Sequence, residues 1–105
     1  MAYVYQVSFD ISPTRQYELE TGSSLERVLG YLRTVLPDEP GFTTARAVFS
    51  LGLPDRTRVV VESVWEHWED LETHRKSALA EDKILREYSH LSPEMLEIRT
   101  FQEVD

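Results

Sequence analysis

Hydrophobic and polar residues alternate at the start of the chain. Every second position from residue 3 to residue 11 is apolar or aromatic: Tyr3, Tyr5, Val7, Phe9 and Ile11. Because successive side chains of a strand point to opposite faces, this pattern predicts a strand with one dry face. The opposite face is mixed and carries Val4, Gln6, Ser8 and Asp10.

The apolar spacing then becomes helical. The tetrapeptide SSLE at residues 23–26 is typical of a capping box, in which Ser23 accepts the amide of Glu26. Apolar residues recur behind it every three or four positions: Leu25, Val28, Leu29, Leu32, Val35 and Leu36. This stripe predicts a helix that is ended by Pro37 and the turn DEPG that follows it at residues 38–41.

Four further segments follow. Residues 42–51 and 57–65 predict two strands joined by a loop, and the second is rich enough in valine to be largely buried. Residues 68–80 have a helical pattern, with a shorter continuation at 84–91. Alternation returns at residues 95–104 and predicts the last strand.

The resulting order of elements predicts the fold. Strand, helix, strand, strand, helix, strand is the split βαβ, ferredoxin-like plan of the α+β class, here a single domain over residues 1–105. Both helices then cover one face of a four-stranded antiparallel sheet. Apolar side chains remain on the other face, namely Val4, Ala45, Ala47, Phe49, Leu96 and Ile98 or their alternates. We therefore expect a second copy of the chain to cover that face, which makes a homodimer that encloses a cavity.

Composition and charge narrow the choice of partners. The 105 residues are 41% hydrophobic and 29% charged, as in a soluble globular domain. Nineteen acidic against 11 basic residues give a net charge of -8, which disfavours nucleic acid and anionic membrane surfaces. No apolar run approaches the ~20 residues of a membrane span, and the first residues alternate like a strand instead of a signal peptide. We therefore expect a cytoplasmic protein.

The residues that hold common cofactors are missing or isolated. There is no cysteine, which excludes disulfides, thiolate metal sites and thiol nucleophiles. Four glycines leave little room for a phosphate-binding loop or a dinucleotide fingerprint. His67 and His74 are two helical turns apart, too far to share a metal ion without other ligands. We therefore expect no metal, flavin or haem cofactor.

Two motifs give the chain a family resemblance. Residues 39–42 read EPGF, and residues 59–74 read VVVESVWEHWEDLETH. With these motifs, residues 23–104 resemble the antibiotic biosynthesis monooxygenase family, which has an E-P-G turn before its second strand, E-x-W at the end of the third, and A-L-x-x-H on the next helix. Trp65, Leu71 and His74 take the corresponding positions. The resemblance implies a dimeric α/β barrel and a cofactor-independent monooxygenase that acts on an electron-rich aromatic, such as a quinol or polyketide intermediate, in a barrel cavity.

Three features depart from the family pattern. His67 stands where a serine or aspartate cap is usual, and Arg75 stands where an apolar residue is common. The chain also has no asparagine, whereas the haem-degrading branch of this fold uses one on its first strand together with a tryptophan and a histidine. This difference disfavours haem degradation, although Trp65 and His74 partly mimic that branch.

His74 is the candidate catalytic residue. A partly buried imidazole that titrates near neutrality can move protons, and the family position coincides with it. The alternative is a histidine held by one backbone carbonyl at the edge of a helix. Trp65 either lines the cavity or simply closes a buried strand. Arg75 extends past the edge of the core, pairs with a carboxylate, or binds an anionic ligand.

Two function hypotheses follow. In the first, the protein is a cofactor-independent monooxygenase with His74 as the base and with Trp65 and Arg75 in substrate binding. In the second, it is a non-catalytic dimeric barrel that binds a small hydrophobic ligand or a protein partner. Within WEHWEDLETH, residues 65–74, we expect only Trp65 and His74 to contact the cavity, while Trp68 packs and His67 is exposed.

Overall fold

The fold matches the predicted plan. A computed structural model describes residues 1–11, 24–51, 55–77, 79–87 and 96–104. Its elements are β1 (Tyr3–Ile11), α2 (Ser24–Thr34), the 3-10 turn η2 (Leu36–Asp38), β2 (Phe42–Phe49), β3 (Thr57–Trp65), α3 (Trp68–Arg75), the π-helical η3 (Leu79–Ile84) and β4 (Glu97–Gln102). The strands lie in the order β2-β3-β1-β4, and all neighbours are antiparallel. This confirms the ferredoxin-like α+β class.

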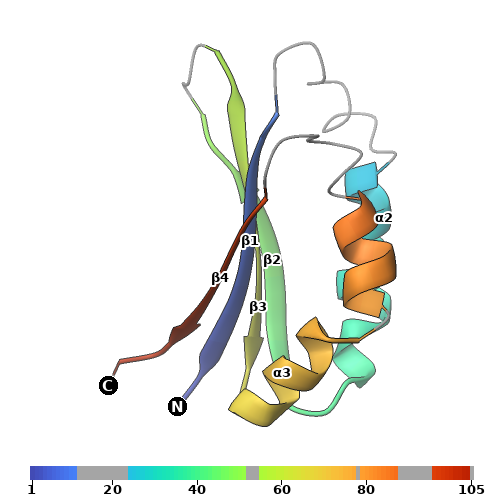
Figure 1. The fold of residues 1–105 in the computed structure, drawn as a ribbon, viewed down its shortest axis with the longest axis vertical. Helices are drawn as coiled ribbons and strands as arrows, with labels where there is room; N and C mark the ends of the chain where they lie inside the picture. Colours follow the sequence, from blue (N-terminus) through green and yellow to red (C-terminus); the bar gives the residue numbers. More distant parts are fainter. Residues whose placement is uncertain (12–23, 52–54, 78, 88–95, 105) are drawn as a thin grey trace.

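All helices lie on one side of the sheet (Figure 1). We call this the inner side and the other the outer side. The predicted alternation of β1 is confirmed, because its odd-numbered residues from Tyr5 to Ile11 are buried on the inner side. The register pairs them with the inner residues of β3, among them Val59 and Val61, and pairs Tyr3 with Trp65. The helical side of this core is formed by Val28, Leu32, Leu36, Leu71 and Ile84.

The helix predicted at residues 68–80 breaks after its second turn. α3 ends at Arg75, and the π-helical segment starts at Leu79. Ser77 explains the break, because its hydroxyl donates to the carbonyl of His74 at 2.6 Å and accepts the amide of Ala80 at 3.2 Å. One serine thus satisfies both the carbonyl at the end of one helix and the amide at the start of the next.

Other boundaries differ less. The second strand ends at Phe49, before the predicted residue 51, and the last strand covers 97–102 of the predicted 95–104. The first helix ends at Thr34, with Leu36 and Pro37 in the following 3-10 turn. The capping serine at position 23, and Tyr88 and Leu91 of the short helix, lie outside the described residues. Among the described residues, no helix has the length and apolarity to cross a membrane.

The outer side carries mainly the alternates of the residues named above, as the expectation allowed. The register puts Ala45, Ala47, Phe49 and Ile98 on the inner side with Tyr5 and Val7, and Leu96 packs against the core just before β4. Their alternates face outward, so the apolar residues there are Val4, Val48, Val60, Val64 and Phe101. The expected apolar face is therefore present with a different membership.

Candidate functional site

A tight turn at residues 39–42 builds one wall of the site. The amide of Phe42 donates to the carbonyl of Glu39 at 3.3 Å, and Gly41 has a φ of 77°. Proline in the second position and glycine with positive φ in the third define a type II turn. A Cβ at Gly41 would also collide with the carboxylate of Asp70, which leaves glycine as the residue that fits. The E-P-G motif therefore fixes the direction of the Glu39 side chain.

The turn is tied to the start of α3. The carbonyl of Gly41 accepts the amide of Glu66 at 2.8 Å, directly after β3. His67 then takes the N-cap position in extended conformation, and its carbonyl accepts the amides of Asp70 and Leu71 at 3.2 Å each. Its side chain makes no capping bond and is exposed, which confirms the expectation for this residue. Two turns of α3 later, His74 faces back toward the E-P-G turn.

His74 is buried and bound to a carboxylate. Its side chain is 3% exposed, and Nδ1 lies 3.0 Å from Oε2 of Glu39. Because an ionised carboxylate only accepts hydrogen bonds, the proton of the neutral imidazole sits on Nδ1 and the lone pair on Nε2. The alternative was a histidine bonded to a backbone carbonyl. The observed partner of Nδ1 is instead the side-chain carboxylate of Glu39.

Aromatic rings surround the imidazole. Trp65 stacks on it, with ring centroids 4.8 Å apart and planes 28° apart, while Tyr5 approaches edge-on at 5.8 Å. The indole of Trp65 is fully buried, and its Nε1 donates to the hydroxyl of Ser63 at 2.9 Å. Trp65 is thus a core residue that also holds the plane of the His74 ring.

These surroundings lower the pKa of His74 below its ordinary value of 6.5. Burial is the largest cause, because it disfavours the charged imidazolium, while the Glu39 carboxylate acts in the opposite direction. The imidazole is therefore neutral at pH 7 and available as a base.

A small pocket opens beside His74. Its volume is about 160 Å³, and its lining consists of Glu39, Pro40, Asp70, Thr73, His74 and Ser77. Nε2 of His74 has no hydrogen-bond partner among the described residues, yet no buried side-chain nitrogen or oxygen there lacks one. It follows that solvent reaches Nε2. His74 itself is one of the residues that line this pocket.

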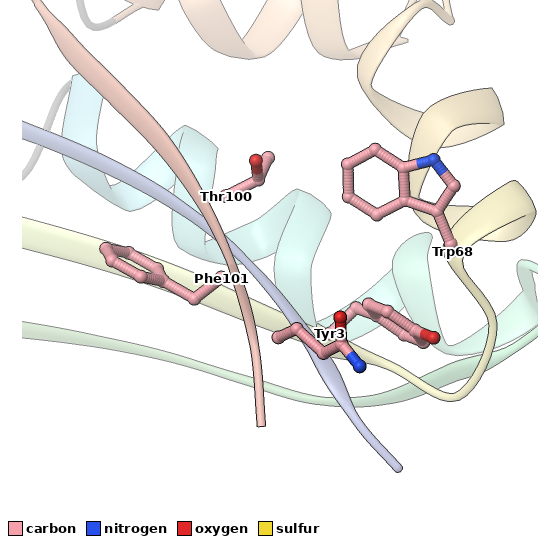
Figure 2. Close-up of a pocket in the computed structure, with 5 residues that line it drawn as sticks. Tyr3, Trp68, Thr100 and Phe101 are labelled. Atoms are coloured by element: carbon pink, nitrogen blue, oxygen red, sulfur yellow. The ribbon is translucent and has the colours of Figure 1, made fainter. Parts of the chain in front are cut away.

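A second, wider pocket lies between the start of α3 and β4 (Figure 2). Its volume is about 460 Å³, and it is lined by Tyr3, Trp68, Thr100, Phe101 and Gln102. Trp68 packs on Tyr3 as expected, with centroids 5.9 Å apart, but it is 39% exposed and also lines this pocket. The expectation that Trp68 only packs was therefore incomplete.

Arg75 is held on the surface by a neighbouring carboxylate. Its Nε and Nη2 donate to the two oxygens of Glu72 at 2.8 and 3.0 Å, and it is not among the residues that line the pocket beside His74. The arginine hydrogen bond is the main cause that lowers the pKa of Glu72. Of the three outcomes considered for Arg75, pairing with a carboxylate is the one observed, and its role in substrate binding stays a prediction.

Glu39 is the residue that sequence reasoning missed. The motif EPGF was used only as a turn signal, although it supplies the partner of His74. The available signal was the glutamate itself, because a buried imidazole needs a hydrogen-bond partner. Within the described ranges, no group of three or more His, Asp or Glu side chains is placed to hold a metal ion.

Comparison with known proteins defines the fold. No protein-family model matches the chain, and no curated protein matches it. Solved structures do: a candidate antibiotic biosynthesis monooxygenase from Deinococcus radiodurans has a TM-score of 0.70 at 14% identity, and the match covers 100% of this chain and 94% of the other. A variant of SnoaB, a cofactor-independent oxygenase from Streptomyces nogalater, has a TM-score of 0.63 at 16% identity over 99% and 94% of the two chains.

A designed protein shares the same architecture. The de novo protein Foldit4 has a TM-score of 0.62 at 15% identity, over 99% of this chain and all of the other. The fold resemblance predicted from the E-P-G and tryptophan–histidine motifs is therefore confirmed. Since a designed protein is included, the fold by itself carries no activity, and function has to be argued from the site.

Proposed function

We propose that this protein is a cofactor-independent oxygenase in which His74 removes a proton from an electron-rich aromatic substrate. The observation that carries the proposal is the Glu39–His74 pair, with Nδ1 bound to the carboxylate at 3.0 Å and with His74 in the lining of the pocket. A neutral imidazole held in one tautomer by a carboxylate is the arrangement that general-base catalysis uses. The fold similarity to a cofactor-independent oxygenase supports the choice of reaction.

The reaction asks little of the protein beyond this base. Removal of a proton from an anthrone or quinol leaves a carbanion or phenolate that reduces O₂ itself. For an anthrone, the ring CH₂ becomes C=O, one oxygen atom enters the product and the other leaves as water. Nε2 of His74 accepts the first proton and returns it to the departing oxygen, while Glu39 stabilises the imidazolium that forms between the two transfers.

Trp65 and Arg75 have supporting parts in this proposal. The stacked indole of Trp65 holds the imidazole plane, so that Nε2 keeps its direction toward the substrate. Arg75 follows His74 directly on α3 and could attract an anionic substrate only by exchanging its bond with Glu72. Trp65 therefore acts through His74, whereas any contribution of Arg75 lies in binding.

A homodimer is part of the same proposal. Val64, Val4 and Phe101 are direct neighbours across β3, β1 and β4, so they form an apolar row on the outer side, which the helices do not cover. A second copy packed on this row would remove it from water.

The second candidate function is a non-catalytic protein that binds a small hydrophobic ligand. The wider pocket beside Trp68 favours it, because the pocket is lined by three aromatic residues and lacks a titratable base. The two functions differ in one respect that can be measured: only the oxygenase turns over a substrate, and it needs His74 to do so.

Oxygen consumption with anthrone as substrate tests the proposal. His74→Ala should lower turnover by roughly 10²-fold or more, the scale of a lost general base. His67→Ala is the matched control, because it removes an exposed histidine from the same helix, and its rate should equal that of the original protein. Equal rates for His74→Ala and the unchanged protein, at equal oligomeric state, would favour the binding function instead.

A further inference from the structure

We propose that the wider pocket is a binding site for a neutral, planar aromatic molecule, separate from the His74 site. The walls of this pocket come from three elements that are far apart in the sequence. Tyr3 lies on β1, Trp68 opens α3, and Thr100 and Gln102 lie on β4 (Figure 2). The inference concerns this pocket alone and does not rest on the oxygenase proposal.

The strand register explains how the pocket is formed. Gln102 pairs with Tyr3, and Thr100 pairs with Tyr5, so both β4 side chains face the inner side, toward Trp68. Phe101 faces outward and borders the pocket from the far side of the same strand. β4 is an edge strand, which leaves the space between it and α3 open.

The exposure of the rings points to a ligand. Trp68 is 39% exposed, although its indole ring is large and mainly apolar, whereas the Phe101 ring points away from it (Figure 2). Tyr3 meets Trp68 at an interplanar angle of 58°, so the two rings form an angled surface instead of a closed stack. Flat apolar rings that border one pocket favour a flat apolar guest, because stacking adds to the hydrophobic gain.

The chemistry of the lining defines the class of ligand. None of its five residues is charged, although 29% of the chain is charged and its net charge is -8. An anion would be repelled by the overall charge, and the lining has no carboxylate to pair with a cation. The hydroxyl of Thr100 and the amide of Gln102 can bind one polar group, and the Gln102 amide nitrogen contacts the sulfur of Met1, which leaves its carbonyl oxygen to accept.

Size and position separate this pocket from the His74 site. A volume of about 460 Å³ lies in the range of small-molecule sites, roughly 300–1,000 Å³. Trp68 and His74 are six residues apart on α3, which puts them about 120° apart around the helix. The two pockets share no lining residue. A ligand bound at Trp68 therefore need not contact His74.

The two indole groups provide the test. In a ¹⁵N-labelled sample each tryptophan gives one indole N–H signal, and the chain has two tryptophans. Addition of 2-naphthol should shift the Trp68 signal, while the Trp65 signal stays, because that indole is buried and bonded to Ser63. If the Trp68 signal stayed unchanged at millimolar naphthol, or if Trp65 shifted instead, the proposal would be overturned.

A matched ligand and matched variants sharpen the result. Naphthalene-2-sulfonate has the same rings with a negative charge. Its affinity should be lower than that of 2-naphthol by about tenfold or more. Trp68→Ala should weaken naphthol binding by about tenfold or more. Thr100→Glu changes an exposed strand residue without removing packing and should weaken binding similarly, which covers the case that Trp68→Ala does not fold.

Two further outcomes are decisive. His74→Ala should bind naphthol as tightly as the unchanged protein, even where its turnover of anthrone is lost, so failure of the oxygenase proposal and of this one can be told apart. A second copy of the chain in the pocket would instead make the Trp68 signal depend on protein concentration while naphthol had no effect. That result would replace the aromatic ligand with a protein contact.

Discussion

The two sides of the sheet are built from the same strands but carry different kinds of residue. On the inner side β1 and β3 present apolar residues to the helices, and Val59, Leu71 and Trp65 are completely buried. On the outer side the valines alternate with charged residues that pair across strands. Arg58 bonds Asp10 at 3.3 Å and Glu97 at 2.8 Å. The inner side is a core, whereas the outer side is a mixed surface of apolar and paired charged residues.

The charged pairs on the outer side matter for this comparison. Glu62 accepts bonds from Gln6 at 2.8 Å and from Arg46 at 3.1 Å, in a row across three strands. Charges that are already paired within one chain can be covered by a second chain at lower cost than free charges. An outer side with apolar rows between paired charges is therefore suited to contact with another molecule.

The largest expected effect is on the inner side. Trp65→Ala removes a fully buried indole that stacks on His74 and packs edge-on against Phe42. The free energy of unfolding should fall by about 3–5 kcal/mol, the range for a large aromatic deleted from a core. Denaturant unfolding measures it. Phe101→Ala on the outer side is the matched comparison, and a loss as large as that of Trp65→Ala would show that the outer side is also core.

The second prediction concerns the outer side. We expect a homodimer with an interface on the order of 2,000 Å² or more in total. Val64→Asp introduces a charge between Val4 and the bulged end of β2 and should convert the dimer to a monomer, as seen by light scattering. Val35→Asp makes the same substitution on the helical side, where the residue is 39% exposed, and should leave the dimer intact. A particle of 12.2 kDa for the unchanged chain at micromolar concentration would refute the dimer.

The fold could be predicted from the sequence because its signals are local and periodic. The alternation of residues 3–11 and the valine run of β3 each specify a strand and its buried face. The break at Ser77 could not be predicted in this way, since it depends on one hydroxyl that bonds to residues on both sides. The sequence also left open which residues of each strand face outward, because a shift of register by one residue exchanges the two faces of a strand.

The site could be predicted only in part. His74 and Trp65 were identified because they match positions in the motif of the family that the sequence resembles, and the structure brings their rings into contact. Glu39 is 35 residues from His74, and their pairing depends on how the E-P-G turn meets α3. No periodic pattern reports such a contact. The wider pocket is also invisible in the sequence, since Trp68 and Thr100 come together only through the sheet.

The third prediction is that the stability of the protein depends on pH through His74 on the inner side. The pKa of His74 in the folded protein lies below the ordinary 6.5, so below pH 6.5 the unfolded chain takes up a proton that the folded one does not. Stability should therefore decrease as the pH falls from about 6.5 toward the folded pKa, and stay constant above that window. His74→Gln should lack this part of the slope in denaturant unfolding. A steeper fall in His74→Gln than in the unchanged protein would contradict the assignment.

The same shift predicts how activity responds to pH. Because Nε2 must be unprotonated to act as the base, kcat/KM for anthrone should persist at pH 6.5 and fall only at lower pH. Glu39→Gln removes the charge that favours the imidazolium, so it should move the fall to still lower pH and reduce the maximal rate. A profile that is the same in Glu39→Gln would exclude the carboxylate from the proton transfer.

The smallest effect is expected at Arg75, which lies on the helical side but outside both pockets. Its guanidinium is bonded to Glu72 on the solvent-facing surface, where an ion pair contributes little. If it stays there during binding, Arg75→Ala should change KM for the uncharged substrate anthrone by less than about twofold. If instead it turns toward the substrate, KM for an anionic quinol should rise by about tenfold or more, while kcat stays the same, because binding and not chemistry is affected. Glu72→Gln provides the control, since it removes the carboxylate that holds the arginine and should then lower KM for the anionic substrate. Steady-state kinetics of the two variants with one neutral and one anionic substrate would distinguish a substrate-binding arginine from a surface ion pair.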